Sequence, residues 1–181
     1  MTSNEQYETS QRDRQPRPTP AQIVVGLDGS PAAAAALEWA AEQSRMSGLP
    51  MRVVYAWQLP AFESAAVVAG GGAVWEAAAA DARARAPRWV LDTLGGTAAG
   101  LRWTLETAEG APGPVLVARS RGARLLVLGT REHTGLRRAV PGSVSHYCLS
   151  HADPPVVAVP APHAEHKADG RGRAMVSGPL L

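Results

Sequence analysis

Cysteine, most aromatic residue types, basic runs and long apolar runs are all scarce in this chain. The single Cys148 excludes an internal disulfide and agrees with a reducing compartment. The formal charge is only +2 with dispersed Lys and Arg, and one Phe and three Tyr offer little for stacking bases, so nucleic acid is not the expected partner. No apolar stretch approaches the roughly 20 residues of a membrane span, and residues 1–20 are too polar for a signal peptide or anchor. We therefore expect a cytoplasmic protein that makes no membrane contact.

Motifs of the common nucleotide-dependent enzymes are also missing. The sequence has no Gly-x-x-x-x-Gly-Lys-Ser/Thr loop and no Gly-x-Gly-x-x-Gly, so neither a P-loop NTPase nor a dinucleotide enzyme is predicted. No local context ties a Ser, a His and an Asp into a triad. His163, His166 and Asp169 lie together in a Pro-rich segment, where a metal site is not expected. The sequence thus predicts no catalytic residue and no metal site.

Length and composition favour one domain between two tails. A chain of 181 residues with 45% apolar residues can bury a core of its own. Residues 1–20 and 161–181 are rich in proline, polar and charged residues with little to bury, which predicts a disordered N-terminal tail and a flexible C-terminal tail. The folded domain is expected over residues 21–160.

Between the tails, apolar runs alternate with helical patterns. Ser30 is the expected N-cap of the first helix, with Pro31 at its first position. Alternation of this kind predicts an α/β domain in which helices cover both faces of a parallel sheet. Strands are expected at 22–27, 51–57, 101–107, 125–128 and 156–159, and helices at 31–47, from about residue 75 with a kink or a break at Pro87, at 114–121 and at 143–150.

A glycine-containing segment follows the fourth predicted strand. Gly129 ends the apolar run, and Gly142 with Ser143 opens the last predicted helix. Glycine lets the main chain approach a ligand closely, and a serine at a helix start adds donors where the helix dipole is positive. The segment therefore predicts an anion site, with phosphate as the expected guest. Simple turn and cap roles for these three residues are the structural alternative.

The spacing of this segment resembles the nucleotide-binding segment of the universal stress proteins, which is a glycine, two residues, a glycine, nine residues and then Gly-Ser or Gly-Thr. The resemblance extends to residues 23–30 and 155–160, so it covers about residues 21–160. It implies a single doubly wound domain with a five-stranded parallel sheet of order 3-2-1-4-5, the adenine nucleotide alpha hydrolase-like fold. Strands one and four are then neighbours, and a ligand binds beyond their carboxyl ends.

For function, the resemblance implies that ATP or a related adenine nucleotide, with or without Mg²⁺, binds as a regulatory ligand in a stress response, with at most slow hydrolysis. Asp28 would help to hold the base or ribose, and the strand near Val54 would contact the adenine. A homodimer is implied through the last strand, by way of Val156, Val157, Ala158 and Val159. The candidate contacts on the glycine segment are Gly129, Gly142 and Ser143, with Thr130, Val144 and Ser145 beside them and with Arg131 and Glu132 on the loop between; a solvated basic loop is the alternative for Arg131.

Glu132 departs from the family pattern, because it occupies the position of the middle glycine. A glutamate would strain a backbone of positive φ. Its charge would repel a phosphate about 4 Å away by about 1 kcal/mol in water and roughly 4 kcal/mol at an effective dielectric of 20. With Mg²⁺ bound, the same carboxylate would instead be a metal partner. Two functions therefore stay open: a nucleotide-binding regulator, or a dimeric stress or interaction protein of the same fold whose altered loop binds no nucleotide.

Overall fold

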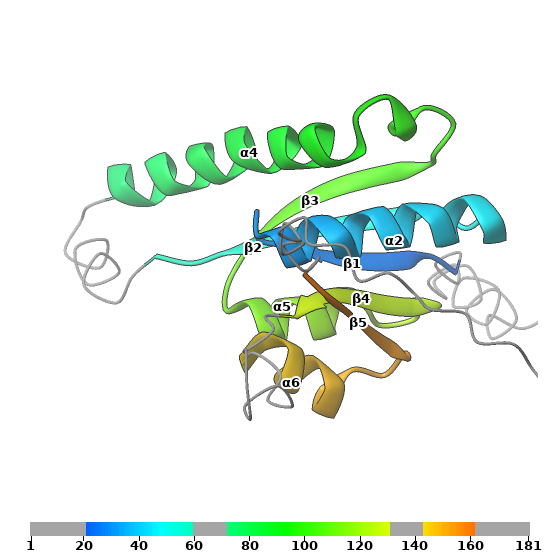
Figure 1. Cartoon of the computed structure of the whole chain (residues 1–181). Helices are drawn as coiled ribbons and strands as arrows, with labels where there is room; N and C mark the ends of the chain where they lie inside the picture. The colour runs from blue at the N-terminus through cyan, green and yellow to red at the C-terminus, as the bar shows by residue number, and fades with distance from the viewer. Residues whose placement is uncertain (1–20, 60–71, 131–142, 162–181) are drawn as a thin grey trace, which may run out of the picture.

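The computed structural model describes residues 21–59, 72–130 and 143–161. Within these ranges the chain forms a five-stranded sheet of order β3-β2-β1-β4-β5, and every pairing is parallel (Figure 1). The predicted fold class and strand order are confirmed. The strands are β1 (Ile23–Leu27), β2 (Met51–Trp57), β3 (Trp103–Glu109), β4 (Leu125–Thr130) and β5 (Val156–Pro160), and the helices are α2 (Pro31–Ser47), α4 (Gly72–Leu94), the short 3₁₀ helix η1 (Gly95–Ala98), α5 (Pro112–Arg119) and α6 (Ser143–His151).

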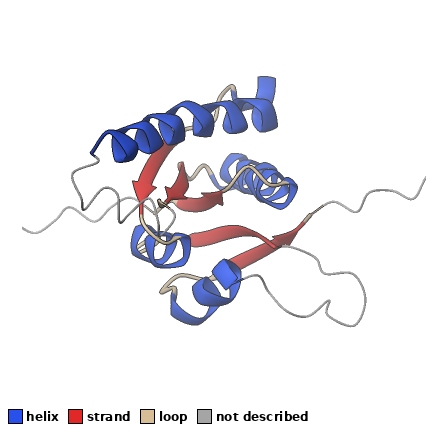
Figure 2. Ribbon diagram, turned by 90° about the vertical axis from the view of Figure 1, so that its left-hand side faces the viewer, coloured by secondary structure: helices blue, strands red, loops and turns tan. Residues whose placement is uncertain are grey.

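Helices cover both faces of the sheet, as Figure 2 shows. On one face α2 and α4 pack over a core that includes Val25 and Leu27 of β1. On the other face α5 and α6 pack over a core that includes Val24 of the same strand. Successive side chains of a strand point to opposite faces, so a strand covered on both sides must be apolar throughout. This explains why β1 is a continuous apolar run, with every residue buried.

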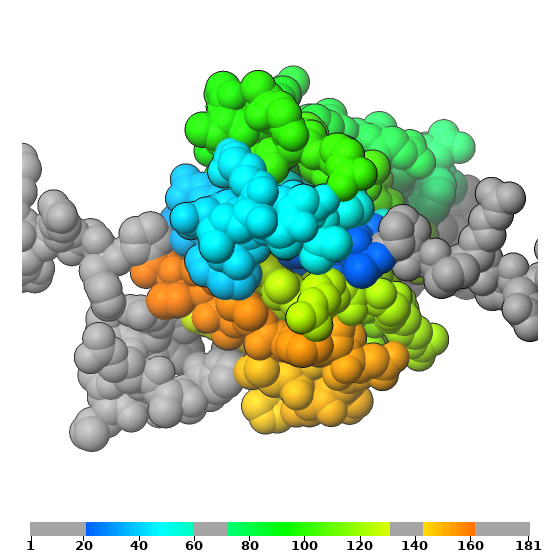
Figure 3. All heavy atoms as spheres, turned by 90° about the vertical axis from the view of Figure 1, so that its right-hand side faces the viewer, coloured from blue at the N-terminus to red at the C-terminus, as the bar shows by residue number. Residues whose placement is uncertain are grey.

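Helix α2 has the bounds that its sequence predicts. The Ser30 hydroxyl caps it by accepting a hydrogen bond from the Ala33 N–H at 3.1 Å, and Gly48 ends it with a φ of 68°. Its alanine-rich face is buried against the sheet at Ala36, Ala40 and other positions. Figure 3 shows α2 (cyan and light blue) between α4 (green) above and β5 and α6 (orange) below. The helix thus spans the centre of one face of the sheet.

Several element boundaries differ from the predictions by a few residues, and the starts of β3, α5 and α4 have identifiable causes or consequences. Strand β3 begins at Trp103 rather than residue 101, because its ladder with β2 starts where Trp103 pairs with Met51. Leu101 still packs against the core from just before the ladder. Helix α5 begins two residues early, at Pro112, where a missing N–H costs nothing. Helix α4 begins at Gly72 and continues through Pro87, so of the two expected alternatives, a kink or a break, the break does not occur.

Several predicted features lie outside the described residues. They are the tails, apart from Ala161, most of the loop before α4, and the site residues Arg131, Glu132 and Gly142. Within the described ranges, no helix combines the length and the hydropathy needed to cross a membrane.

Candidate functional site

The turn that leaves β1 carries the first candidate residue, Asp28. Gly29 takes a φ of +76°, and the Ser30 N–H donates to Oδ1 of Asp28 at 2.9 Å. Asp28 is therefore a turn former, as its local sequence suggests. The same turn places its exposed carboxylate at the carboxyl end of β1, next to the end of β4. The local role and the proposed ligand role are compatible, because the hydrogen bond to Ser30 uses only one carboxylate oxygen.

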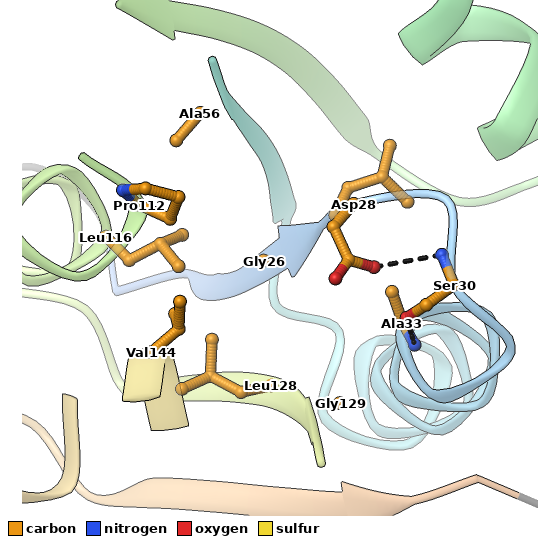
Figure 4. A pocket seen from close by; sticks show the side chains of 11 residues that line it. Gly26, Asp28, Ser30, Ala33, Ala56, Pro112, Leu116, Leu128, Gly129 and Val144 are labelled. Atoms are coloured by element: carbon orange, nitrogen blue, oxygen red, sulfur yellow. Dashed lines mark hydrogen bonds between the residues drawn. The ribbon is translucent and has the colours of Figure 1, made fainter. Parts of the chain in front are cut away.

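A cavity of about 270 Å³ opens beside this turn (Figure 4). In Figure 4, Ala56, Pro112 and Leu116 lie on one side, and Asp28 and Ser30 lie on the other. The walls are mostly apolar, with a few polar groups at one end, which is the usual composition of a site for a small organic ligand. The lining residues are Gly26, Leu27, Asp28, Ser30, Ala33, Ala56, Pro112, Leu116, Leu128, Gly129 and Val144.

Gly26 forms part of the cavity wall because it lacks a side chain. A Cβ at this position would lie 2.8 Å from Cδ2 of Leu128 and 3.1 Å from Cδ1 of Leu116. Both leucines belong to the core between the sheet and α5. Any larger residue at position 26 would therefore enter the space that the leucines border. A glycine inside a buried strand often marks such a close approach, and this signal was available in the sequence.

A second, more polar cavity of about 100 Å³ adjoins the first. It shares Asp28, Ser30, Gly129 and Val144 with the larger cavity and adds Ala32, Ser143 and Ser145. Ser143 and Val144 begin α6, so the backbone N–H groups of its first turn have no partner within the helix. The positive end of a helix dipole at such a position favours an anion. The structure thus brings Asp28, Gly129, Ser143, Val144 and Ser145 together, as the sequence predicts.

Gly129 has a packing role that the sequence did not reveal. A Cβ there would lie 2.4 Å from the carbonyl carbon of Ala32 and 2.5 Å from the nitrogen of Ala33. Both atoms belong to the main chain at the start of α2. The missing side chain therefore lets α2 pack directly on the end of β4. Contact between Gly129 and a phosphate stays a prediction.

The remaining predicted site residues have distinct places. Ser145 is buried, and its hydroxyl donates to the Gly129 carbonyl at 3.3 Å, which ties α6 to β4. Thr130 ends β4 and does not line the larger cavity. Val54 is fully buried in the core and does not line it either. Ala56 lies two residues further along the same face of β2 and does line it, so the residue on β2 nearest the cavity is one that the sequence did not identify.

Comparison with known proteins gives this site a family context. The model of the universal stress protein family matches residues 21–160. The chain belongs to the universal stress protein family. Among curated relatives, a universal stress protein of Mycobacterium tuberculosis is 32% identical over an alignment of 153 residues that covers 76% of this chain and 47% of that protein. Another from the same organism is 32% identical over 164 residues, covering 90% of this chain and 56% of its own. The chain spans about half the length of the curated relatives it matches.

Solved universal stress proteins share the fold. UspA of Lactobacillus plantarum has 22% identity and a TM-score of 0.61, with 77% of this chain and 97% of that chain covered. A universal stress protein solved in complex with cAMP has 22% identity and a TM-score of 0.56, with 79% and 99% covered. One from Archaeoglobus fulgidus, solved in complex with dAMP, has 24% identity and a TM-score of 0.54, with 77% and 97% covered. At these identities the likeness shows the fold alone.

Proposed function

We propose that this universal stress protein domain binds ATP or a related adenine nucleotide, with or without Mg²⁺, as a regulatory ligand. The observation that carries the proposal is the pair of adjoining cavities at the carboxyl ends of β1 and β4. The larger one has apolar walls suited to a flat base, and the smaller one lies at the start of α6, where backbone N–H groups favour a phosphate. The point where the winding of an open parallel sheet reverses is the usual position for such a ligand.

Relatives support the choice of an adenine nucleotide. Two solved universal stress proteins of the same fold are in complex with cAMP and with dAMP. Both of those ligands join an adenine base to a sugar and a phosphate. The volumes of the two cavities, about 270 and 100 Å³, agree with a base and sugar in the larger cavity and a phosphate in the smaller one.

A binding role is favoured over catalysis by the groups that line the cavities. Among the described lining residues, the ionisable side chain is that of Asp28. The Ser30 hydroxyl accepts from Ala33, and the Ser145 hydroxyl donates to Gly129. Among the described lining residues, no histidine or lysine lies beside Ser30, Ser143 or Ser145 to act as a general base. We therefore expect a regulatory ligand with at most slow hydrolysis.

We also propose a homodimer that forms through β5, in the cytoplasm. Strand β5 is an edge of the described sheet, and an edge offers unpaired backbone groups to another chain. Val157 and Val159 pack against the core of their own subunit, whereas Ala158 is exposed. The interface would thus consist of the strand's outer backbone edge and Ala158, rather than of all four residues in equal measure.

The test of nucleotide binding is calorimetric titration with ATP, with and without Mg²⁺, after mass analysis of any ligand that copurifies. Ala56→Leu should weaken ATP binding at least tenfold, because its added carbons enter the larger cavity. Ala80→Leu is the matched control, since Ala80 is exposed on α4, and it should leave affinity unchanged. Wild-type protein that neither carries nor binds a nucleotide would refute the proposal and favour the dimeric interaction protein. Equal affinity of the two variants would place the ligand elsewhere.

A further inference from the structure

The turn that carries Asp28 is contacted on its other side by a tryptophan of α4. A Cβ on Gly29 would lie 2.5 Å from Cε2, 2.6 Å from Cζ2 and 3.0 Å from Cδ2 of Trp89. These atoms belong to the fused rings of the indole, so the indole occupies the space that a side chain of residue 29 would need. Two constraints therefore favour glycine at position 29: the positive φ of the backbone and the space taken by Trp89.

Trp89 is itself held from the sheet side. The Tyr55 ring lies 5.2 Å from the Trp89 ring, centroid to centroid, at an interplanar angle of 90°. Such an edge-to-face pair is a favoured aromatic geometry. Tyr55 lies on β2, where it pairs with Leu27, the last residue of β1. The indole is thus fixed between Tyr55 on the sheet and the turn that follows β1.

The turn separates two hollows in the protein. On one side lies the proposed nucleotide cavity, which Asp28 and Ser30 line. On the other side lies a cavity of about 180 Å³, lined by Gly29, Ser30 and Trp89 among others. Because the turn has a cavity on each side, it would have room to shift toward α4 if the Trp89 indole were removed. The position of the turn relative to a ligand then depends on the side chain that contacts it from the α4 side, which is Trp89.

We propose that Trp89 is a positioning residue for the nucleotide site, which sets the place of the Asp28–Ser30 turn through its contact with Gly29. The inference rests on the proposed function, since it concerns the geometry of the same site. Trp89 does not line the nucleotide cavity, so its effect on binding is indirect. Replacing it with a smaller side chain would let the turn relax toward α4 and withdraw the Asp28 carboxylate from the ligand.

The experiment compares Trp89→Leu with Trp103→Leu, both measured by ATP calorimetry and thermal unfolding. Both tryptophans are half-buried and pack against the same core cluster, but Trp103 begins β3, where it pairs with Met51 at the amino end of β2. The two variants lose the same volume at different places. Trp89→Leu should weaken ATP binding at least tenfold, and Trp103→Leu should change it less than twofold at a similar loss of stability. Trp89→Phe, which keeps a flat ring, should recover most of the affinity.

A spectroscopic readout separates positioning from general destabilisation. ATP titration of the wild type should change tryptophan emission, because a nucleotide bound against the Asp28–Ser30 turn would alter the environment of the Trp89 indole that contacts the turn from behind. The change should disappear in Trp89→Phe and persist in Trp103→Phe. Equal ATP affinities of the two leucine variants, or a full emission change in Trp89→Phe, would overturn the inference while leaving the proposed function intact. A wild type that binds no ATP would overturn both.

Discussion

Gly129→Ala should destabilise the protein whether or not a nucleotide is present. The added Cβ would approach the main-chain atoms of Ala32 and Ala33 to 2.4 and 2.5 Å. Real Cβ atoms do not come so close, and a helix backbone cannot rotate away as the end of a side chain can. The clash is relieved only when β4 and the start of α2 move apart, which loosens the packing between them.

The expected cost is at the upper end of the range for overpacked cores. Inserting a methyl group into a well-packed interior typically costs about 1–3 kcal/mol, and the rigid partner here favours roughly 3 kcal/mol. For a chain of this length, that loss lowers the melting temperature by roughly 6–12 °C. The effect should be the same in nucleotide-free protein, because it arises from packing alone.

Urea unfolding followed by circular dichroism measures this loss. Gly96→Ala is the matched control, because Gly96 lies in η1 with open space around the position of a Cβ. The control should stay within about 0.5 kcal/mol of the wild type, as surface substitutions usually do. If Gly129→Ala is as stable as the wild type but binds ATP poorly, the packing argument is wrong and the glycine serves the ligand.

Two further predictions concern β5 and the buried thiol. Ala158→Lys should convert a wild-type dimer to monomer in light scattering, because it adds a charge to the edge strand of the proposed interface, whereas Ala80→Lys on exposed α4 should leave the dimer intact. A wild type that is already monomeric at micromolar concentration would refute the β5 interface. Burial raises the pKa of the Cys148 thiol to about 11, so native protein should resist thiol reagents at pH 8 and react once unfolded. The neutral Cys148 thiol should make its full contribution to the free energy of unfolding below about pH 8.5, where an unfolded thiol titrates. That contribution should be lost as the pH rises toward 11, and Cys148→Ala should lack this loss.

Element boundaries were predicted well where they depend on residues close together in the sequence. Ser30, Pro31 and Gly48 carry cap chemistry in their own side chains or conformations, and the bounds of α2 follow from them. The start of β3 was displaced because the partner strand determines it, through the pairing of Trp103 with Met51. Periodicity identified the apolar face of β3 correctly, but it contains no information on where a neighbouring strand begins.

The site was predicted only along the segments that carry the family pattern. The candidates Asp28 and Ser143 do line the cavities, whereas the lining residues Ala56, Pro112 and Leu116 were not among the candidates, since small and apolar residues have the same appearance in any core. Their role comes from the parallel sheet, which brings the end of β2 and the start of α5 to the end of β1. Trp89 was missed for the same reason, because its contact with Gly29 joins residues that are distant in sequence.

The hydrogen bond from Ser30 to Asp28 favours one orientation of a nucleotide in the proposed site. Because Oδ1 already accepts from the Ser30 N–H, the carboxylate is held in one orientation and offers Oδ2 to a guest. A carboxylate accepts hydrogen bonds and donates none, so it suits a sugar hydroxyl or an amine and repels a phosphate. The start of α6, which lines the same smaller cavity, has the opposite preference. A nucleotide would therefore lie with its sugar toward the end of β1 and its phosphates toward Ser143, and the reversed orientation would place like charges together at Asp28.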